Sequence, residues 1–250
     1  MNVTTSTPAT VTERGPAAFF KTRMGSFFAV VPLAFWTVNH LWNNLASLRG
    51  AHAWEAAVVQ HSSPFAEAIG ATIALAPLLL HTVWGFSRLF TWRPNAVSYS
   101  YYGNIKFILQ RLSAVGVLLF LGAHIYLAWI KPHVFEGHGE EFEDIAKEMF
   151  TSADGPTLIV YVLGTLGVSY HIGNGLQSWV VGWGLVGSRD AVKRFEWVAI
   201  GTFVVLLAMS WGGIFGLYTH GREIVAHEKA SASAAASPSA GAPVAGGNAP

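Results

Sequence analysis

The chain has 250 residues, of which 52% are hydrophobic and only 12% are charged, and its mean hydropathy is +0.41. A soluble domain carries about 25% charged residues, so this composition excludes an ordinary soluble domain and predicts a membrane protein. The chain has no cysteine. Disulfides, cysteine-ligated zinc, iron–sulfur clusters and covalently attached haem are therefore excluded from it.

Five uncharged apolar segments are each long enough to cross a bilayer, which takes about 20 helical residues. The polar residues 1–22 before them lack the pattern of a cleaved signal peptide. The third segment is expected to begin near residue 104, because residues 105–110 continue its apolar face. The fourth is overlong, and we expect it to project from the bilayer or to kink near Gly173 and Gly175. The five segments are residues 24–48, 68–87, 112–130, 155–188 and 197–221.

The remaining segments are polar or of low complexity. Residues 135–154 hold many acids and are predicted to form an acidic amphipathic loop on the outer surface. The chain after the last apolar segment, almost entirely Ala, Ser, Pro and Gly from residue 230, predicts a disordered tail. We therefore expect an all-α protein with a polar N-terminus (1–22), a five-helix transmembrane bundle (23–222) and a disordered tail (223–250).

The distribution of charge predicts the orientation of this bundle. With five spans, the two termini lie on opposite sides of the membrane. The side of the N-terminus collects ten of the 15 basic residues and only three of the 14 acidic ones. Because basic loops stay in the cytoplasm, the N-terminus is predicted to be cytoplasmic and the C-terminus to lie outside.

Four histidines, His40, His81, His124 and His171, lie in four different apolar segments. An ionisable ring in hydrocarbon is costly, so such residues face the bundle interior and have a function. From the outer helix ends, His40 and His124 are about 13 and 10 Å deep, and His81 and His171 roughly 20 and 24 Å deep. Two imidazoles at one depth suit a b-type haem held between helices, so we predict two haems. A hydrogen bond to a neighbouring helix is the alternative for each ring.

Other residues near these histidines are candidates for contact with the two haems. Small residues would let a flat macrocycle approach the backbone, although close helix packing is an alternative explanation for them. Haem propionates need cationic or hydrogen-bonding partners. For the basic candidates, the alternative explanation is that they only anchor this side of the protein at the membrane surface. Arg111, which immediately precedes the third apolar segment, is the strongest candidate. The small residues are Gly85, Gly122, Gly173 and Gly175, and the propionate candidates are Arg23, Ser26, Arg88, Arg111, Ser113 and Lys193.

The segments around the histidines resemble a known family. They read Asn-His-Leu at 39–41, Leu-His-Thr-Val-Trp-Gly at 80–85, Gln-Arg-Leu-Ser at 110–113 leading to His124, and His-Ile-Gly-Asn-Gly-Leu at 171–176. Over residues 22–222 the chain resembles the dihaem cytochrome b subunit of succinate dehydrogenase and fumarate reductase. The resemblance implies that His81 and His171 bind the iron of the proximal haem, and that His40 and His124 bind that of the distal haem.

The resemblance also implies a function and partners. An FAD-containing flavoprotein subunit and an iron–sulfur subunit would dock on the cytoplasmic face, and electrons would pass between succinate or fumarate and a membrane quinone, menaquinone or ubiquinone. This chain would anchor the complex in the lipid of a bacterial inner membrane, with no dicarboxylate-binding catalytic residue of its own. No nucleic-acid partner is expected. Both a single complex and a dimer of complexes are compatible with the resemblance.

Two alternatives remain at this point. One is the cytochrome b subunit of another quinone-linked enzyme of the hydrogenase, formate dehydrogenase or nitrate reductase type. The other is a haem-free transporter or scaffold with structural histidines.

Overall fold

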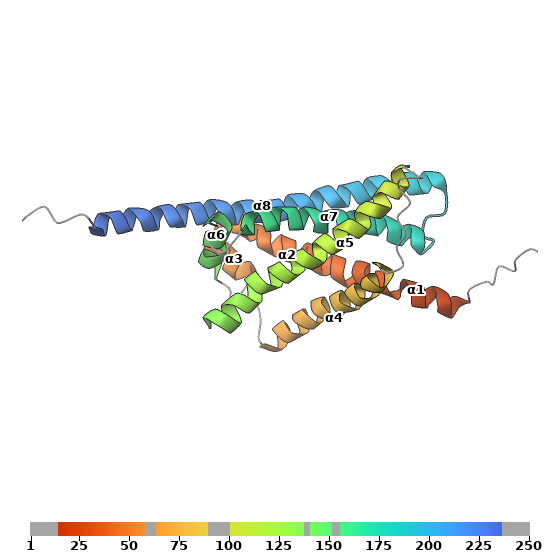
Figure 1. The fold of residues 1–250 in the computed structure, drawn as a ribbon, viewed down its shortest axis with the longest axis horizontal. Helices are drawn as coiled ribbons and strands as arrows, with labels where there is room; N and C mark the ends of the chain where they lie inside the picture. Colours follow the sequence, from red (N-terminus) through yellow and green to blue (C-terminus); the bar gives the residue numbers. More distant parts are fainter. Residues whose placement is uncertain (1–14, 59–63, 90–100, 138–140, 152–155, 237–250) are drawn as a thin grey trace, which may run out of the picture.

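The computed structural model describes residues 15–58, 64–89, 101–137, 141–151 and 156–236, and every regular element within these ranges is helical (Figure 1). The predicted all-α class is therefore confirmed. In chain order, the elements are α1 (Pro16–Phe28), η1 (Ala29–Leu33), α2 (Ala34–Asn44), η2 (Leu45–Arg49), α3 (Ala51–Val58), α4 (Pro64–Leu89), α5 (Tyr102–Ile125), η3 (Tyr126–Glu136), α6 (Phe142–Thr151), α7 (Thr157–Gly182) and α8 (Arg189–Ala236).

Among the described residues, four helical stretches are long and apolar enough to cross a membrane. They contain the first, second, third and fifth predicted segments. The fourth segment forms α7, whose apolar character is diluted by polar residues such as His171 and Asn174. Five spans therefore remain a prediction. The four stretches are Arg23–Arg49, Ala68–Leu89, Tyr102–Glu136 and Arg189–Ala235.

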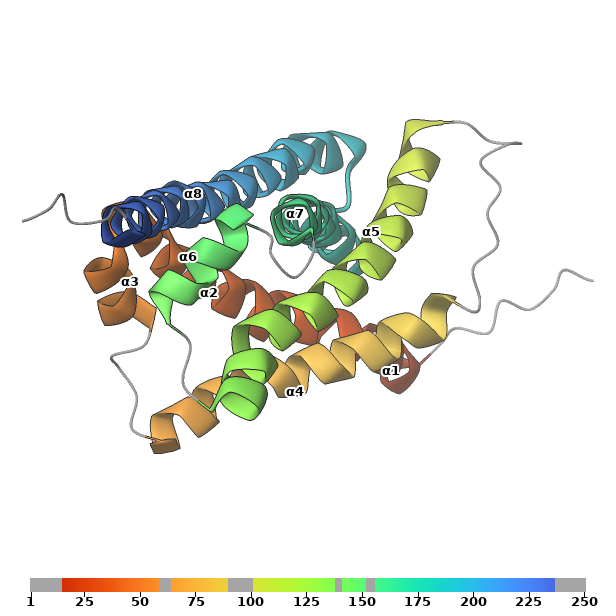
Figure 2. The ribbon, with the colours of Figure 1, turned by 60° about the vertical axis from the view of Figure 1, so that its left-hand side comes forward.

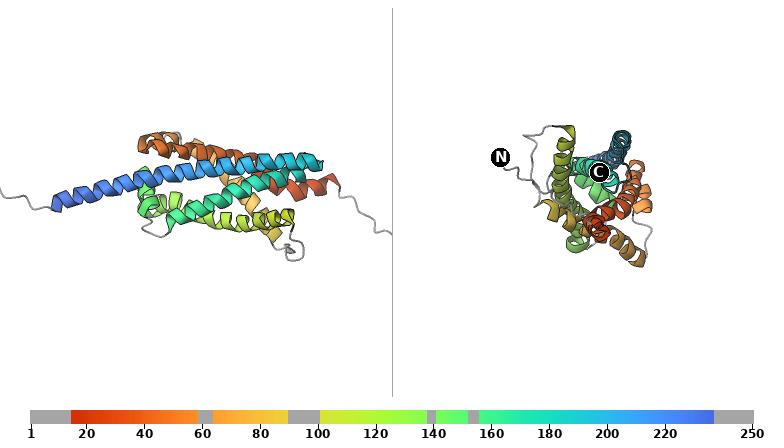
Figure 3. Two further views of the ribbon diagram at one scale, coloured as in Figure 1. Left: turned by 90° about the horizontal axis from the view of Figure 1, so that it is seen from above. Right: turned by 90° about the vertical axis from the view of Figure 1, so that its right-hand side faces the viewer.

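The helices run roughly along one long axis, and α1 and the last turns of α8 lie at opposite ends of the molecule (Figure 1). Figure 2 shows α7 almost end-on between α5 and α8, against which it packs extensively. Helix α4 instead packs against α1 and η1. Seen from above, α8 extends well beyond the other helices (Figure 3). Side chains from α2, α4, α5 and α7 can therefore meet inside the bundle.

Prolines and glycines affect these helices in different ways. Pro32 lies in the π-helical η1, where the wider turn tolerates its missing N–H group, whereas Pro77 lies inside α4. Helix α7 passes through Gly173 and Gly175 as one uninterrupted α-helix and ends at Gly182. Gly173 packs directly against α8: a Cβ added to it would lie 2.8 Å from the Ala199 carbonyl oxygen. That this segment projects from the bilayer or kinks near the two glycines stays a prediction.

The best-buried apolar core lies at one end of the bundle, where η2, α3, α6 and α8 meet. The side chains of Trp54 and Phe142 are almost completely buried there. The Ser47 hydroxyl donates a 2.9 Å hydrogen bond to the Gly213 carbonyl and ties η2 to α8. Along the membrane-spanning stretches, by contrast, most large apolar side chains point outwards. Lipid covers such side chains, so close helix contacts rely on small residues such as Gly213.

The prediction of a loop over residues 135–154 is corrected by α6. Its amphipathic pattern is real: Phe142, Ala146 and Met149 recur at helical spacing and are buried, while Glu143 and Asp144 are exposed. Packing of this apolar stripe against α8 stabilises a helix where the acidic composition suggested a loop.

The prediction of a disordered tail over residues 223–250 is wrong for its first half. Helix α8 continues to Ala236, and Lys147 of α6 donates a 3.0 Å hydrogen bond to Glu228 on this extension. Alanine, glutamate and lysine are strong helix formers, and the next proline is Pro238. Residues 237–250, like residues 1–14, lie outside the described part of the chain.

Candidate functional site

The structure brings the four membrane histidines together as two pairs. The ring centroids of His40 on α2 and His124 on α5 are 5.8 Å apart. Those of His81 on α4 and His171 on α7 are 6.1 Å apart. A metal ion bonded to two imidazole nitrogens about 2 Å away holds the ring centres roughly 6 Å apart. Both pairs therefore have the spacing that coordination of one iron by two imidazoles requires.

We call His81 and His171 the inner pair and His40 and His124 the outer pair, after their predicted depths. In the inner pair, the Nδ1 atoms of both rings lie within hydrogen-bond distance of neighbouring groups. His81 Nδ1 lies 2.9 Å from the carbonyl oxygen of Gly25. His171 Nδ1 lies 3.2 Å from Ser113 Oγ and 3.2 Å from the amide nitrogen of Gln110. The same amide donates to the His171 carbonyl at 3.0 Å, and its oxygen accepts a 2.7 Å bond from Asn174. Contacts of this kind at Nδ1 fix the orientation of an imidazole ring.

In the outer pair, stacking does more of the positioning. His40 stacks on Trp36 with ring centroids 4.8 Å apart, and His124 stacks on Phe120 with centroids 5.6 Å apart. Each aromatic ring precedes its histidine by four residues, which places both on the same helix face. His124 Nδ1 also lies 3.1 Å from the hydroxyl of Tyr161 on α7. The outer rings thus have fewer polar partners than the inner ones.

Each histidine pair offers only two ligands, which suits a cofactor that itself supplies the other ligands to its metal ion. No group of three or more His, Cys, Asp or Glu side chains within the described ranges could hold a metal ion. Two imidazoles at this spacing are, however, a ligand set that suits a haem iron. The residues present therefore fit haem and do not fit a metal ion held by protein ligands alone.

The predicted small residues fall into two groups. A Cβ added to Gly85 or Gly122 would meet nothing within 4 Å, so there is open space next to these positions. Gly173 instead packs against α8, and a Cβ added to Gly175 would lie 3.2 Å from the amide nitrogen of the Gln110 side chain. Close helix packing, the alternative considered above, therefore explains Gly173. The sequence reasoning missed Gly25, where a Cβ would collide with the ring of Trp84.

Two of the predicted propionate partners, Arg88 and Arg111, lie close enough for their charges to interact. Each guanidinium stands over an aromatic ring of its own helix, Trp84 at 5.5 Å and Phe107 at 4.2 Å. The Nε atom of Arg111 is buried and has no hydrogen-bond partner in the part of the chain that the structure describes. A buried donor without a partner is costly, so this position suits an anionic group.

The other four candidates are more dispersed. Ser26 donates a 2.7 Å bond to the Arg23 carbonyl and accepts one of 3.4 Å from the Trp183 indole. The Arg23 guanidinium lies 5.1 Å from the ring centre of Phe19. Ser113 lies against the His171 ring, and Lys193 is exposed near the start of α8.

Sequence reasoning also missed an ion pair that joins three helices. Lys106 of α5 donates to Glu196 of α8 at 2.8 Å and to the Gln177 amide oxygen of α7 at 2.9 Å. Gln177, a long polar side chain within a predicted membrane segment, is the signal that could have indicated this contact.

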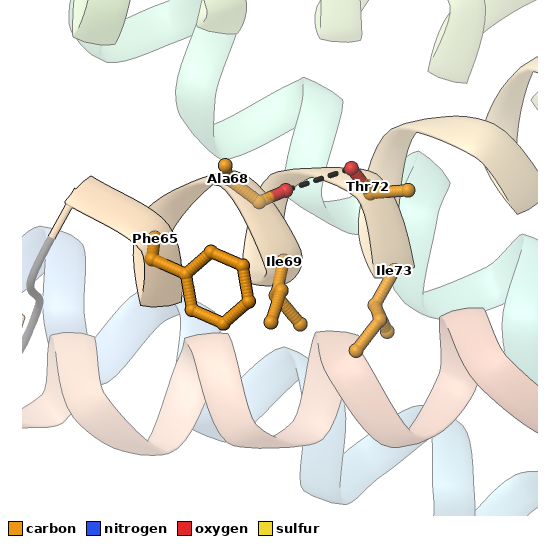
Figure 4. A pocket seen from close by; sticks show the side chains of 5 residues that line it. All are labelled: Phe65, Ala68, Ile69, Thr72 and Ile73. Atoms are coloured by element: carbon orange, nitrogen blue, oxygen red, sulfur yellow. Dashed lines mark hydrogen bonds between the residues drawn. The ribbon is translucent and has the colours of Figure 1, made fainter.

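A shallow hollow of about 240 Å³ lies along the N-terminal half of α4. All five residues that line it come from this one helix (Figure 4). The only side-chain polar group among them, the Thr72 hydroxyl, donates to the Ala68 carbonyl at 2.7 Å. No group is left to orient a polar ligand, and none of the four histidines lines the hollow. It is therefore an apolar surface rather than a candidate active site. The lining residues are Phe65, Ala68, Ile69, Thr72 and Ile73.

Comparison with known proteins identifies the family. Residues 93–210 match the family described as succinate dehydrogenase/fumarate reductase transmembrane subunit. The chain is also 30% identical over 205 residues to the succinate dehydrogenase cytochrome b558 subunit of Bacillus subtilis (strain 168), an alignment covering 82% of this chain and 98% of the relative. Both findings favour this family over the hydrogenase, formate dehydrogenase and nitrate reductase types. The chain therefore belongs to the family of succinate dehydrogenase/fumarate reductase transmembrane subunits.

Proposed function

We propose that this chain anchors its complex in the membrane and passes electrons between an iron–sulfur subunit and a membrane quinone through two haems b. The observation that carries the proposal is the presence of two imidazole pairs with centroids 5.8 and 6.1 Å apart. The cytochrome b558 name of the Bacillus relative supports haem b as the cofactor. Two imidazoles on each iron would leave no open position, which favours electron transfer over binding of oxygen.

In this proposal, His81 and His171 hold the inner haem, and His40 and His124 hold the outer one. The bound haems would supply one-electron carriers at two depths of the bundle. The protein orients the four rings through Nδ1 contacts and aromatic stacking. The buried Arg111 Nε, which has no partner among the described residues, supports Arg111 as a cationic partner for the inner propionates. The remaining candidates are Arg23, Ser26, Arg88, Ser113 and Lys193.

The proposal includes five spans, with α7 as the fourth, an N-terminus in the cytoplasm and a C-terminus outside. The 26 residues of α7 are about 39 Å long, enough to cross the hydrocarbon core. A flavoprotein subunit with FAD and an iron–sulfur subunit would bind the cytoplasmic face. The absence of cysteine fits this division, because iron–sulfur chemistry then belongs to a partner. The complex acts on menaquinone or ubiquinone, as a single unit or as a dimer of complexes.

A reduced-minus-oxidised absorption spectrum of the purified complex tests the proposal. We expect b-type bands, two haems per copy of this chain, and copurification of a flavoprotein with an iron–sulfur protein. A complex without b-type bands would contradict the proposal and favour the haem-free scaffold.

The charge distribution predicts where the partner subunits dock. The inner side carries ten basic and three acidic residues, so we expect the iron–sulfur subunit to bind near residues 88–111 and 189–194. Lysine-specific crosslinking followed by mass spectrometry measures this. Lys193 should crosslink to the iron–sulfur subunit, whereas Lys147 on α6 should not. The opposite pattern would reverse the orientation of the chain.

A further inference from the structure

The two histidine pairs differ in the groups that face their Nδ1 atoms. In the inner pair, His81 Nδ1 faces a backbone carbonyl and His171 Nδ1 faces Ser113 Oγ. In the outer pair, His124 Nδ1 faces the hydroxyl of Tyr161, 3.1 Å away. No hydrogen bond to the His40 ring occurs within the described part of the chain, where the ring stacks on Trp36. The outer pair therefore has one side-chain hydroxyl as its polar partner.

The direction of these hydrogen bonds follows from metal binding. A neutral histidine that binds a metal through Nε2 carries its proton on Nδ1, which then acts as a donor. Ser113 can accept it, because its own hydroxyl proton is directed to the Gln110 carbonyl at 2.9 Å. The Gln110 amide nitrogen carries two N–H donors, one of them directed to the His171 carbonyl, and it cannot accept a proton from Nδ1. The Tyr161 hydroxyl oxygen is correspondingly the acceptor for the Nδ1 proton of His124.

We propose that Tyr161 is a positioning residue that accepts the Nδ1–H bond of His124 and thereby lowers the reduction potential of the outer haem, with Ser113 acting in the same way on the inner haem through His171. This inference rests on the proposed function. Its physical basis is that an acceptor on Nδ1 makes the imidazole a more basic ligand. A more basic ligand stabilises the ferric iron over the ferrous iron, so loss of the acceptor raises the potential.

The Tyr161→Phe variant isolates the hydroxyl from the rest of the side chain. The Tyr161 ring packs edge-on against Phe120 at 5.5 Å and against the His124 ring at 5.6 Å, and phenylalanine keeps both contacts. In a stepwise redox titration followed by absorption, we expect the outer component of Tyr161→Phe to shift to a more positive potential while the inner component stays in place. Low-spin ferric electron paramagnetic resonance provides a second readout, in which only the outer haem signal should move.

Two further variants complete the design. Ser113→Ala should raise the potential of the inner component alone. Tyr218→Phe is the matched control, because the Tyr218 ring contacts Phe150 rather than a histidine, and it should shift neither component. The outer component is identified as the one lost in His40→Ala.

The possible results separate this inference from the proposed function. If Tyr161→Phe leaves the outer component in place, lowers its potential, or shifts the inner component instead, the role of Tyr161 is wrong while the two-haem proposal stands. If the parent complex itself shows no b-type components, the proposed function has failed.

Discussion

Replacing His81 with alanine should remove the inner haem and leave the outer haem in place. Replacing His171 should remove the same spectral component, because each iron needs both of its axial imidazoles. His40→Ala and His124→Ala should each remove the other component. Haem content and difference spectra of the four purified variants measure the result, and we expect about half of the parent haem to remain in each.

The two haems should also titrate at different potentials. The inner pair lies nearer the basic side of the protein and the outer pair nearer the acidic side. Positive surroundings favour the reduced iron, so the component lost in His81→Ala should have the higher potential. If His81→Ala and His40→Ala lose the same component, the pairing is wrong. If none of the four variants changes the spectrum, these histidines only pack between helices.

The Gly221→Leu variant should destabilise the end of the bundle where α6 packs on α8 by about 1–3 kcal/mol. Gly221 of α8 is buried against the backbone of α6, and even a Cβ at this position would overlap the carbonyl group of Ala146. Leucine would push α6 away from α8 and open the core around Trp54 and Met149. For a chain of this size the thermal midpoint should fall by several degrees. Thermal unfolding in detergent and protease cleavage within α6 measure the effect.

Gly201→Leu is the matched control. Gly201 lies on the same helix and is exposed, and a Cβ added to it meets nothing within 4 Å. Leucine also has a higher helix propensity than glycine, so this variant should be as stable as the parent or slightly more stable. Equal destabilisation by both substitutions would show that overpacking against α6 is not the cause.

Much of the architecture could be predicted from the sequence because it depends on local composition. Apolar segments of about 20 residues predict helices wherever they occur. The observed α4 and α8 contain the second and fifth expected segments, and the third runs through α5 into η3. The rise of 1.5 Å per residue similarly converts chain position into depth. It groups His40 with His124 and His81 with His171, and the structure brings together the same residues.

Local composition gave wrong predictions where packing between helices, or continuation of a helix, decides the conformation. Residues 142–151 are acidic enough to suggest a loop, yet their three buried residues at helical spacing pack on α8. Residues 223–236 contain so much alanine and serine that they resemble a disordered segment, yet they continue an existing helix. Extending a helix avoids the cost of nucleating a new one, which a composition argument ignores.

The immediate surroundings of the histidines depend on tertiary structure alone. Gln110, Ser113 and Tyr161 contact histidines that lie 37 to 61 residues away along the chain. Such contacts depend on how each helix is rotated about its axis and how closely it approaches its neighbours. The outward faces of these helices are almost uniformly apolar, so no periodic pattern encodes that rotation. The sequence by itself thus determined the all-α class, the apolar segments and which histidines lie close together, whereas side-chain packing between distant helices decided which groups contact each ring.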